Sequence, residues 1–517
     1  TDLMKGIQKA GELLFNKIRE KKHIRIIGDY DVEGVMASYI LHTGLKRLGA
    51  ICDVKIPNRV VDGYGLNGKL VCQSYLDGVN TIVTCDNGIA ASNLIEILSK
   101  LGISTIVTDH HDVPYIEQEN GLRQYVIPPA NAVINPKQPG CKYPFKGLCG
   151  AGVAWKLICY LYDQAGISEN EKNDFLEFVC IATISDVMDL TDENRIIVKE
   201  GLKRLRQTEN IGLRELINQS CIDIRNIDVD DIGFKLGPCL NASGRLDTAE
   251  RSLELLQTES YLEAELLATN LINLNEKRKA MTMHEVDKAI HLVESTSLKD
   301  DMVLVVYIPD CHESIVGIVA GKLKEHYHKP VFVLAGAYGL VKGSGRSIEQ
   351  YSMYEELYKC KEYLTSFGGH TMAAGIVLEE KDVSLFRQRI NELCDLTEED
   401  LITKVHIDAK IAIRDINYEL VKSIESLQPF GNGNKKPLFM SENLHVFSPR
   451  IVGKNKNGVK MSVMDECKHK IDAVYFGEAN AFVDYVNTHN NLAFAYTIGI
   501  NRYIGNETLQ MIIANYK

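Results

Sequence analysis

The sequence lacks several features that mark other classes of protein. Its 517 residues contain no apolar run close to the roughly 20 residues that cross a bilayer, so we expect no membrane association. Thirteen cysteines are scattered without a single C-x-x-C pair, which argues against a disulfide framework and against a paired-cysteine zinc site. The first residues lack the charged and then apolar plan of a signal peptide, and the expected compartment is the cytoplasm.

A net positive charge is also missing. The formal charge is −11 at pH 7, so a nucleic-acid partner would have to be held by a local basic strip against a repulsive background. The hydrophobic content of 45% and the charged content of 25% are those of an ordinary globular protein. The length predicts two to four domains.

Three short apolar runs rich in β-branched residues each end on acidic residues. They cover residues 23–28, 81–85 and 103–107, and helical patterns lie between them. This order predicts a parallel α/β sheet, in which ligands bind at the carboxyl ends of the strands. The candidate ligands that follow the three runs are Asp29, Asp31, Glu33, Asp86, Asp109, His110 and His111.

So many carboxylates share one sheet edge only if cations offset their repulsion, which predicts a metal site. Oxygen-rich ligands with one or two imidazoles suit Mn²⁺ or Mg²⁺ better than Zn²⁺. Two such ions are a standard device for attacking a phosphoester. Taken singly, acids in glycine-containing loops are often only turn formers and helix caps. Their conjunction, joined by Asp186 at the end of a predicted helix, favours the metal site.

The second half of the chain predicts three further parts. Between Gly244 and Pro309 there is no Gly or Pro, and the apolar spacing predicts a long helix joining two lobes, or else two shorter packed helices. A second α/β unit follows, with strands at 302–308 and 331–334. From about residue 400, short alternating runs such as 405–413 and 450–463 predict a small β-barrel.

These motifs resemble those of the DHH phosphoesterases and, within them, the RecJ single-strand-specific 5′→3′ exonucleases. The acidic loop, Asp86-Asn87-Gly88, Asp109-His110-His111 and Asp186 resemble the four motifs of the catalytic domain, in the family's order. The run from Gly368 to Gly375 is similar to the glycine-rich motif of the DHHA1 domain. The run from Leu236 to Arg245 is similar to a RecJ-specific segment. The resemblance covers nearly the whole chain.

The resemblance implies an α/β fold with an appended barrel. A DHH parallel-sheet domain would cover residues 1–250, and a connecting long helix would cover 251–300. A smaller α/β DHHA1 domain would follow at 301–400. An OB-like nucleic-acid-binding β-barrel would cover 401–517.

The resemblance also implies roles for individual residues. Two divalent cations would be held by Asp31, Glu33, Asp86, His110 and Asp186, with Asp29 close by and Asp86 bridging. Asp109 and His111 would support them, and His370 would donate to the scissile phosphate. The predicted substrate contacts are Asn241, Arg245, Ser344, Arg346, Gly368 and Gly369.

The implied activity is removal of 5′-mononucleotides from single-stranded DNA in repair and recombination, with Mn²⁺ as the first choice of cation and Mg²⁺ as the second. The implied partners are single-stranded DNA, single-strand-binding protein and a helicase. In the barrel, lysines and two aromatic rings are candidate strand contacts, although lysines in turns are often only solvated. These residues are Lys454, Lys456, Lys460, Lys468, Lys470, Phe447 and Tyr475.

One departure from the family pattern leaves alternatives open. The third acid of the first motif is normally Asp, whereas this chain has Glu33, whose carboxylate reaches about 1.5 Å further. Cys239 stands where a basic residue is expected. The chain is therefore either a working nuclease or a catalytically weakened variant that still binds DNA. A phosphodiesterase for oligonucleotides or cyclic dinucleotides is a third alternative, which the barrel disfavours.

Overall fold

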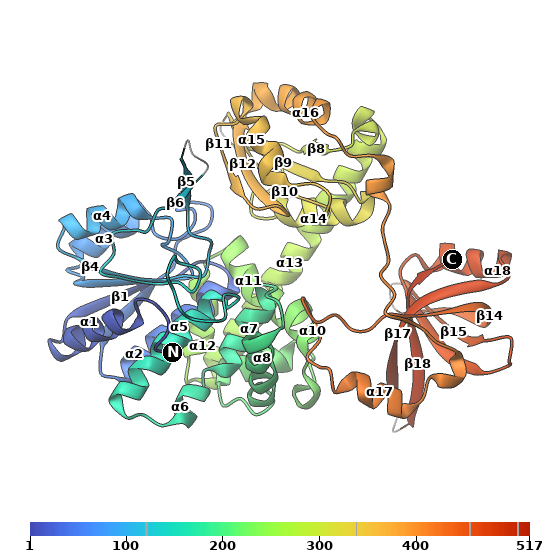
Figure 1. Ribbon diagram of the computed structural model, residues 1–517, viewed down its shortest axis with the longest axis horizontal. Coiled ribbons are helices and arrows are strands. Elements are labelled where there is room, and N and C mark those ends of the chain that lie inside the picture. Colours follow the sequence, from blue (N-terminus) through green and yellow to red (C-terminus); the bar gives the residue numbers. More distant parts are fainter. Residues whose placement is uncertain (119–121, 338, 454–455, 504–505) are drawn as a thin grey trace. The chain divides into compact units, whose positions relative to one another are not determined.

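The computed structural model describes the chain except for residues 119–121, 338, 454–455 and 504–505. It forms two compact units, Thr1–Ile402 and Thr403–Lys517. Among the described residues, the first unit contains two five-stranded sheets and a two-stranded hairpin, and the second contains a single closed sheet (Figure 1).

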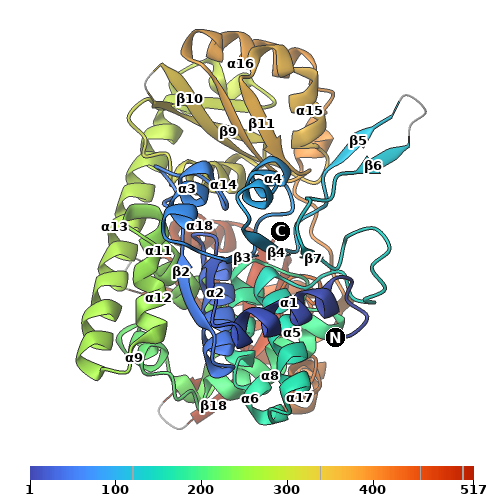
Figure 2. The same ribbon diagram turned by 90° about the vertical axis from the view of Figure 1, so that its left-hand side faces the viewer.

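The first sheet is entirely parallel. Its strands are β1 (His23–Ile27), β2 (Ile51–Lys55), β3 (Thr81–Cys85), β4 (Ser104–Thr108) and β7 (Ala132–Ile134). They lie in the order β2-β1-β3-β4-β7. The strand order reverses at β1 and β3, which is the place where ligands bind in open α/β sheets. A short hairpin, β5 (Tyr115–Glu117) with β6 (Arg123–Tyr125), projects beyond β4 (Figure 2).

Helices cover both faces of this sheet. The helices on one face are α1 (Ile7–Arg19), α2 (Val32–Arg47) and α5 (Gly150–Ala165). On the other face lie α3 (Gly68–Leu76) and α4 (Ser92–Lys100) (Figures 1 and 2).

Alternate residues of the strands supply two separate cores. Ile26, Val83 and Ile106 pack with α1, α2 and α5, whereas Ile27 and Ile82 pack with α3 and α4. Side chains alternate across a strand, so a strand covered on both faces is apolar at every position. This burial explains why the strands read as continuous apolar runs in the sequence.

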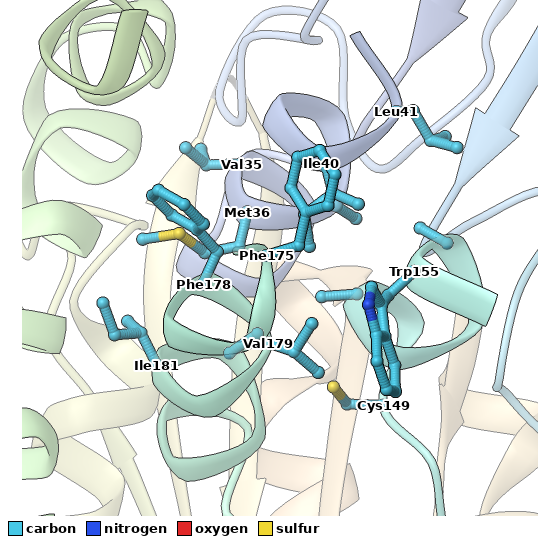
Figure 3. Close-up of a cluster of buried hydrophobic side chains, with 14 of the residues drawn as sticks. Val35, Met36, Ile40, Leu41, Cys149, Trp155, Phe175, Phe178, Val179 and Ile181 are labelled. Carbon is cyan, nitrogen blue, oxygen red and sulfur yellow. The ribbon is translucent and has the colours of Figure 1, made fainter. Parts of the chain in front are cut away.

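Three helices contribute to one apolar cluster in the larger core. Met36 of α2, Trp155 of α5 and Phe178 of α7 (Leu176–Ser185) belong to one buried cluster (Figure 3). α7 carries apolar residues on nearly its whole surface, as expected for a helix with no exposed face. A Cβ on Gly44 would lie 2.6 Å from the Ile158 side chain, so only glycine lets α2 approach α5 this closely. This packing fixes the ends of the three helices relative to one another.

A helical region completes the first lobe. Its elements are α6 (Glu169–Asn173), α8 (Asp192–Leu205), α9 (Ile211–Gln219), α10 (Val229–Asp231), a π-helix (Ile232–Leu236), α11 (Gly237–Leu246) and α12 (Glu250–Gln257). One long helix does occur within the predicted span 251–300, because α13 runs without a break from Tyr261 to Glu294, but residues 251–257 belong to α12. Within the described parts of the chain, no helix has both the length and the apolarity that a bilayer crossing requires.

The second sheet of this unit is mixed. Its strands are β8 (Leu304–Tyr307), β9 (Val331–Ala337), β10 (Leu340–Arg346), β11 (Ser366–Gly369) and β12 (Ala373–Glu379), in the order β11-β12-β10-β9-β8. Only β8 and β9 are parallel. The end of α13 and α14 (Val316–Tyr327) pack on one face, and α15 (Met353–Lys359) and α16 (Val383–Glu392) pack on the other.

The C-terminal unit is a barrel-like sheet. Its strands are β13 (Ala409–Lys410), β14 (Phe439–Val452), β15 (Gly458–Met464), β16 (Lys470–Phe476), β17 (Leu492–Tyr503) and β18 (Asn506–Tyr516). Pairing of β14 with β17 closes the order β13-β14-β15-β16-β18-β17. The helices are α17 (Tyr418–Glu425) and α18 (Ala479–Thr488), and Phe482 of α18 lies in the barrel core.

The predicted fold class is confirmed, whereas two predicted strand boundaries are wrong. The run 405–413 contains only the two-residue strand β13, because its first half is largely exposed and only Ala409, Ile411 and Ile413 reach the barrel core. The run 450–463 is shared between the end of β14 and β15. A continuous apolar pattern does not reveal a reversal of the chain within it.

The buried carboxyl of Glu177 in α7 generates a pH-dependent prediction. Burial raises its pKa to about 7, although the Thr208 hydroxyl donates to it at 2.8 Å. The stabilising contribution of this raised pKa is complete below the ordinary carboxyl pKa and is lost as the pH rises through 7. We expect Glu177→Gln to increase the free energy of unfolding at pH 8 by up to about 3 kcal/mol and to change little at pH 5. Thermal melts at both pH values test this.

The exposed Glu254 of α12 supplies the matched control. Glu254→Gln should leave the melting temperature nearly unchanged at both pH values. Equal responses of the two variants would contradict the burial argument.

Candidate metal centre

The loop after β1 carries three of the predicted ligands into the N-terminus of α2. Asp31 caps the helix, and its Oδ1 accepts the Gly34 N–H at 3.0 Å. A Cβ on Gly34 would lie 2.5 Å from the Asp29 carbonyl oxygen, so glycine is required for the loop to close. Asp29 and Glu33 are only 2% and 3% exposed, which places both carboxylates inside the protein.

Asp86 follows β3 in the left-handed region, with φ of 62°. Its N–H donates to the Thr108 carbonyl of β4 at 3.0 Å, and the Tyr64 hydroxyl donates to its carbonyl at 2.8 Å. A Cβ on Gly150, the first residue of α5, would lie 2.7 Å from Asp86 Oδ1. A strained backbone that is held by several neighbours is typical of functional positions.

Asp109 organises the triplet after β4. Its carboxylate accepts the N–H groups of Ile89 at 2.9 Å, His110 at 2.7 Å and His111 at 3.1 Å, and the His111 Nδ1 at 2.8 Å. Burial acts to raise the pKa of Asp109, but the hydrogen bond from His111 holds that pKa below its ordinary value. Asp109 therefore fixes the orientation of the two histidines.

His110 lies at the centre of the acidic groups. Its Nε2 is 3.3 Å from Asp86 Oδ1, 3.4 Å from Glu33 Oε1 and 3.9 Å from Asp186 Oδ2. Burial lowers the pKa of His110 to about 3, so the imidazole is neutral at pH 7. A neutral imidazole has the free lone pair that a metal ligand needs.

The neighbouring carboxyl groups have raised pKa values. Burial is the largest cause for Asp29, Glu33 and Asp86, and charge repulsion by other carboxylates adds to it. Burial raises the pKa of Asp186, at the end of α7, to about 6. Each shift means that the metal-free protein disfavours the ionised form at this sheet edge.

The donor atoms fit a pair of cations. Asp29 Oδ1, Asp86 Oδ1 and His110 Nε2 are buried without a hydrogen-bond partner among the described residues. The side chains form three overlapping groups, and within each group the donor atoms lie within 4.8 Å of one another. Asp86 and His110 each belong to two of the groups, which favours two adjacent ions over one. The groups are Asp29-Asp31-Asp86, Asp86-His110-His111 and Glu33-His110-Asp186.

The glycine-rich motif of the second sheet lies beside this centre. His370 occupies the turn between β11 and β12, its side chain is 71% exposed, and its Nδ1 lies 3.9 Å from Asp112 Oδ2. Gly368 and Gly369 are exposed, and Gly369 has a φ of 147° that glycine alone adopts readily. His370 is therefore free to contact a ligand.

Four of the predicted substrate residues form hydrogen bonds within the protein. Asn241 Oδ1 accepts the Val32 N–H at 3.1 Å, so this amide supports the start of α2. Arg346 Nη1 donates to Ser344 Oγ at 2.9 Å, and Arg245 Nη1 donates to the Ser314 carbonyl at 2.7 Å.

A third arginine, Arg59, was missed by the sequence analysis. Its guanidinium lies 4.6 Å from the Tyr30 ring centroid. Burial, followed by the positive charge of Arg59, lowers the pKa of Arg245 to about 9 and also lowers that of Arg346. Arg59 is therefore near enough to both arginines for its charge to act on them, and none of the three forms an ion pair with a carboxylate in the described part of the chain. Such a cluster suits a phosphate group.

Sequence reasoning missed Arg59, Tyr64 and Gly150 for the same reason, which is that their local sequence carries little sign of a role at the site. Arg59 and Tyr64 lie in an irregular segment with no helical or strand periodicity, and Gly150 is an ordinary first helical residue in the sequence. The positive charge of Arg59 was the only local signal.

Cys239, which stands where a basic residue is expected, is buried, and its Sγ accepts the Asn275 amide at 3.3 Å.

The predicted strand contacts of the barrel have mixed outcomes. Phe447 is 42% exposed, and Lys460 is exposed on the neighbouring strand. The prediction of Tyr475 as a free stacking surface is wrong, because its ring stacks on Phe482 with 4.3 Å between centroids. Lys454 lies outside the described residues. The other three predicted lysines are exposed, namely Lys456, Lys468 and Lys470.

Comparison with known families assigns three segments. Residues 23–183 match the DHH family, N-terminal domain. Residues 300–396 match the DHHA1 domain, and residues 407–515 match the RecJ OB domain.

Curated relatives cover the whole chain. The single-stranded-DNA-specific exonuclease RecJ of Escherichia coli is 33% identical over 99% of this chain and 90% of its own length. The protein of the same name from Bacillus subtilis is 39% identical over 92% of this chain, which spans 59% of that relative's length.

Solved structures show a similar fold. RecJ from Thermus thermophilus in complex with Mn²⁺ has a TM-score of 0.83 at 25% identity, over 99% of this chain and 72% of that one. An exonuclease RecJ bound to manganese has a TM-score of 0.64 at 31% identity, over 75% of this chain and 94% of that one. By its sequence and by its three matched segments, the chain belongs to the RecJ family of DHH phosphoesterases.

Proposed function

We propose that the chain is a metal-dependent exonuclease that degrades single-stranded DNA from its 5′ end to 5′-mononucleotides, in repair and recombination. The observation that carries the proposal is the overlap of the ligand groups at Asp86 and His110 in a chain of the RecJ family. Its relatives are named for single-strand-specific exonuclease activity, and two related structures contain manganese. Mn²⁺ is accordingly the proposed cation and Mg²⁺ the second choice.

In this proposal, the acids of the first loop would hold two cations together with Asp86, His110 and Asp186. Bound cations of this kind activate water and neutralise the charge that develops on phosphoryl oxygens. Asp109 keeps His110 and His111 oriented through its hydrogen bonds. The pKa of His111 is raised despite its burial, because Asp109 accepts its N–H.

The proposed polarity rests on the arginine cluster. Arg59, Arg245 and Arg346 bind the terminal 5′ phosphate, since clustered guanidinium groups without carboxylate partners recognise phosphate oxygens. His370 donates to the scissile phosphate from its exposed turn. A terminal phosphate held beside the metal centre places the first phosphodiester bond for cleavage.

The alternative functions are less well supported. A phosphodiesterase for oligonucleotides or cyclic dinucleotides does not account for residues 407–515, which match the RecJ OB domain. A catalytically weakened variant would require a misplaced Glu33 carboxylate. Instead, Glu33 Oε1 accepts the Gly150 N–H and lies 3.4 Å from His110 Nε2, so the added methylene leaves the carboxylate within the cluster.

The proposed compartment is the cytoplasm, which is consistent with thirteen cysteines that form no disulfide among the described residues. Single strands arise where duplex DNA is unwound, and they are then coated by protein. We therefore infer a helicase and single-strand-binding protein as the classes of partner.

The substrate proposal is tested with 5′-labelled DNA in Mn²⁺. We expect mononucleotide release from long single strands, little release from blunt duplex, and slower cleavage when the 5′ phosphate is removed. The exposed Lys199→Ala variant of α8 serves as a control for loss of a surface charge. Cleavage of dinucleotides alone would contradict the proposal.

Asp86→Asn tests the metal centre. Asn tolerates the left-handed backbone, and it removes a buried charge that has no partner. We expect a higher melting temperature without metal, no further rise on addition of Mn²⁺, and a loss of nuclease activity of roughly 100-fold or more. Retention of the Mn²⁺-dependent rise would contradict a ligand role for Asp86.

Glu33→Asp tests whether the longer acid is a defect. The shorter side chain withdraws from the buried Gly150 N–H and from His110. We therefore expect Mn²⁺ affinity to fall about tenfold, with a matching loss of activity at limiting metal. Titration of activity against Mn²⁺ measures this, and a gain of activity would show that the family's usual acid is better here.

A further inference from the structure

A second group of metal-ligating side chains lies in the C-terminal unit, on the loop that joins β15 to β16. The loop has the sequence Asp-Glu-Cys-Lys-His over residues 465–469. The Asp465 N–H donates to the His469 carbonyl at 3.1 Å, and the Lys468 N–H donates to the Asp465 carbonyl at 3.0 Å. This tight closure brings one donor atom each of Asp465, Cys467 and His469 within 4.8 Å of one another.

The spacing of two of these atoms matches the coordination of a metal ion. His469 Nδ1 lies 3.1 Å from Asp465 Oδ2. Two ligands at zinc–nitrogen and zinc–oxygen distances of about 2.0–2.1 Å lie about 3.3 Å apart in a tetrahedral site. Asp465 Oδ1 accepts the His469 N–H at 2.8 Å, which holds the carboxylate in this position without the ring.

A cavity of about 130 Å³ adjoins the loop, and Asp465 and Cys467 line it. This volume holds several water molecules, each of which occupies about 30 Å³. Glu442 also lines the cavity, but its carboxylate is paired with Lys410. Glu466 also lines the cavity, but its carboxylate is not in the group of donor atoms within 4.8 Å of one another, so the remaining ligand for a metal on the loop is water from the cavity.

We propose that Asp465, Cys467 and His469 bind one zinc ion, with water as its fourth ligand. A thiolate and an imidazole select Zn²⁺ over Mg²⁺ and Mn²⁺, so the site differs in kind from the oxygen-rich centre of the first unit. The ion joins Cys467, in the middle of the β15–β16 loop, to Asp465 and His469 at the two ends of the loop. A search for paired cysteines does not find this site, because it has a single cysteine.

The test uses the full chain, freed of metal by a chelator and titrated with Co²⁺ as a spectroscopic probe. Thiolate ligation gives a near-ultraviolet sulfur-to-cobalt charge-transfer band. We expect the band in the unmodified chain and its loss in Cys467→Ser. Cys221→Ser, which changes an exposed cysteine of the first unit, should keep the band. The Asp86→Asn background removes the contribution of the metal centre.

Zinc itself is measured by competition with a coloured chelator. We expect one tightly bound zinc fewer per chain in Cys467→Ser, and at least about tenfold weaker binding in His469→Gln. Melting in chelator confirms that each variant is folded, and His469→Gln gives an independent comparison if the serine variant is not. Absence of the cobalt band, or a band and zinc content unchanged in both variants, would overturn the proposal and leave an ordinary Asp–His ion pair.

Discussion

The crowding of buried carboxylates at one edge of the first sheet is the constraint on which the rest of the structure depends. Asp29, Glu33 and Asp86 are almost inaccessible to solvent, and burial raises the pKa of each. An unpaired buried charge costs several kcal/mol, so this arrangement is unfavourable without cations. The protein keeps it because the surrounding packing leaves these side chains no alternative position.

That packing comes from three helix ends. The N-terminus of α2 carries Asp31 and Glu33, the N-terminus of α5 supplies the Gly150 N–H, and Asp186 follows the C-terminus of α7. The apolar cluster of these helices begins at these ends, with Val35 in the first turn of α2 and Cys149 immediately before α5 (Figure 3). Core stability of this kind offsets local strain at a site. The ligand geometry is therefore a consequence of the core packing behind the helix ends.

The sequence predicted what is local and missed what depends on packing. β1, β3 and β4 are apolar runs buried on both faces, and each stops at a polar residue, so both the strands and the acids after them were recognisable. Arg59 and Gly150 carry no periodic signal, because their roles arise only from contacts with Tyr30 and Asp86. The ring of Tyr475 was misjudged for the same reason, since Phe482 covers it only in the folded barrel.

The negative net charge is compatible with a nucleic-acid substrate once metal binding is considered. A chain of charge −11 repels a polyanion at long range, and the carboxylates add to this repulsion where the scissile phosphate must lie. In the proposed function, two divalent cations would reverse the sign of the potential at that place. Metal and DNA would then bind cooperatively, because each would relieve a repulsion that the other would meet. The carboxylates whose ionised forms burial disfavours in the metal-free protein would therefore make strand binding conditional on a loaded centre.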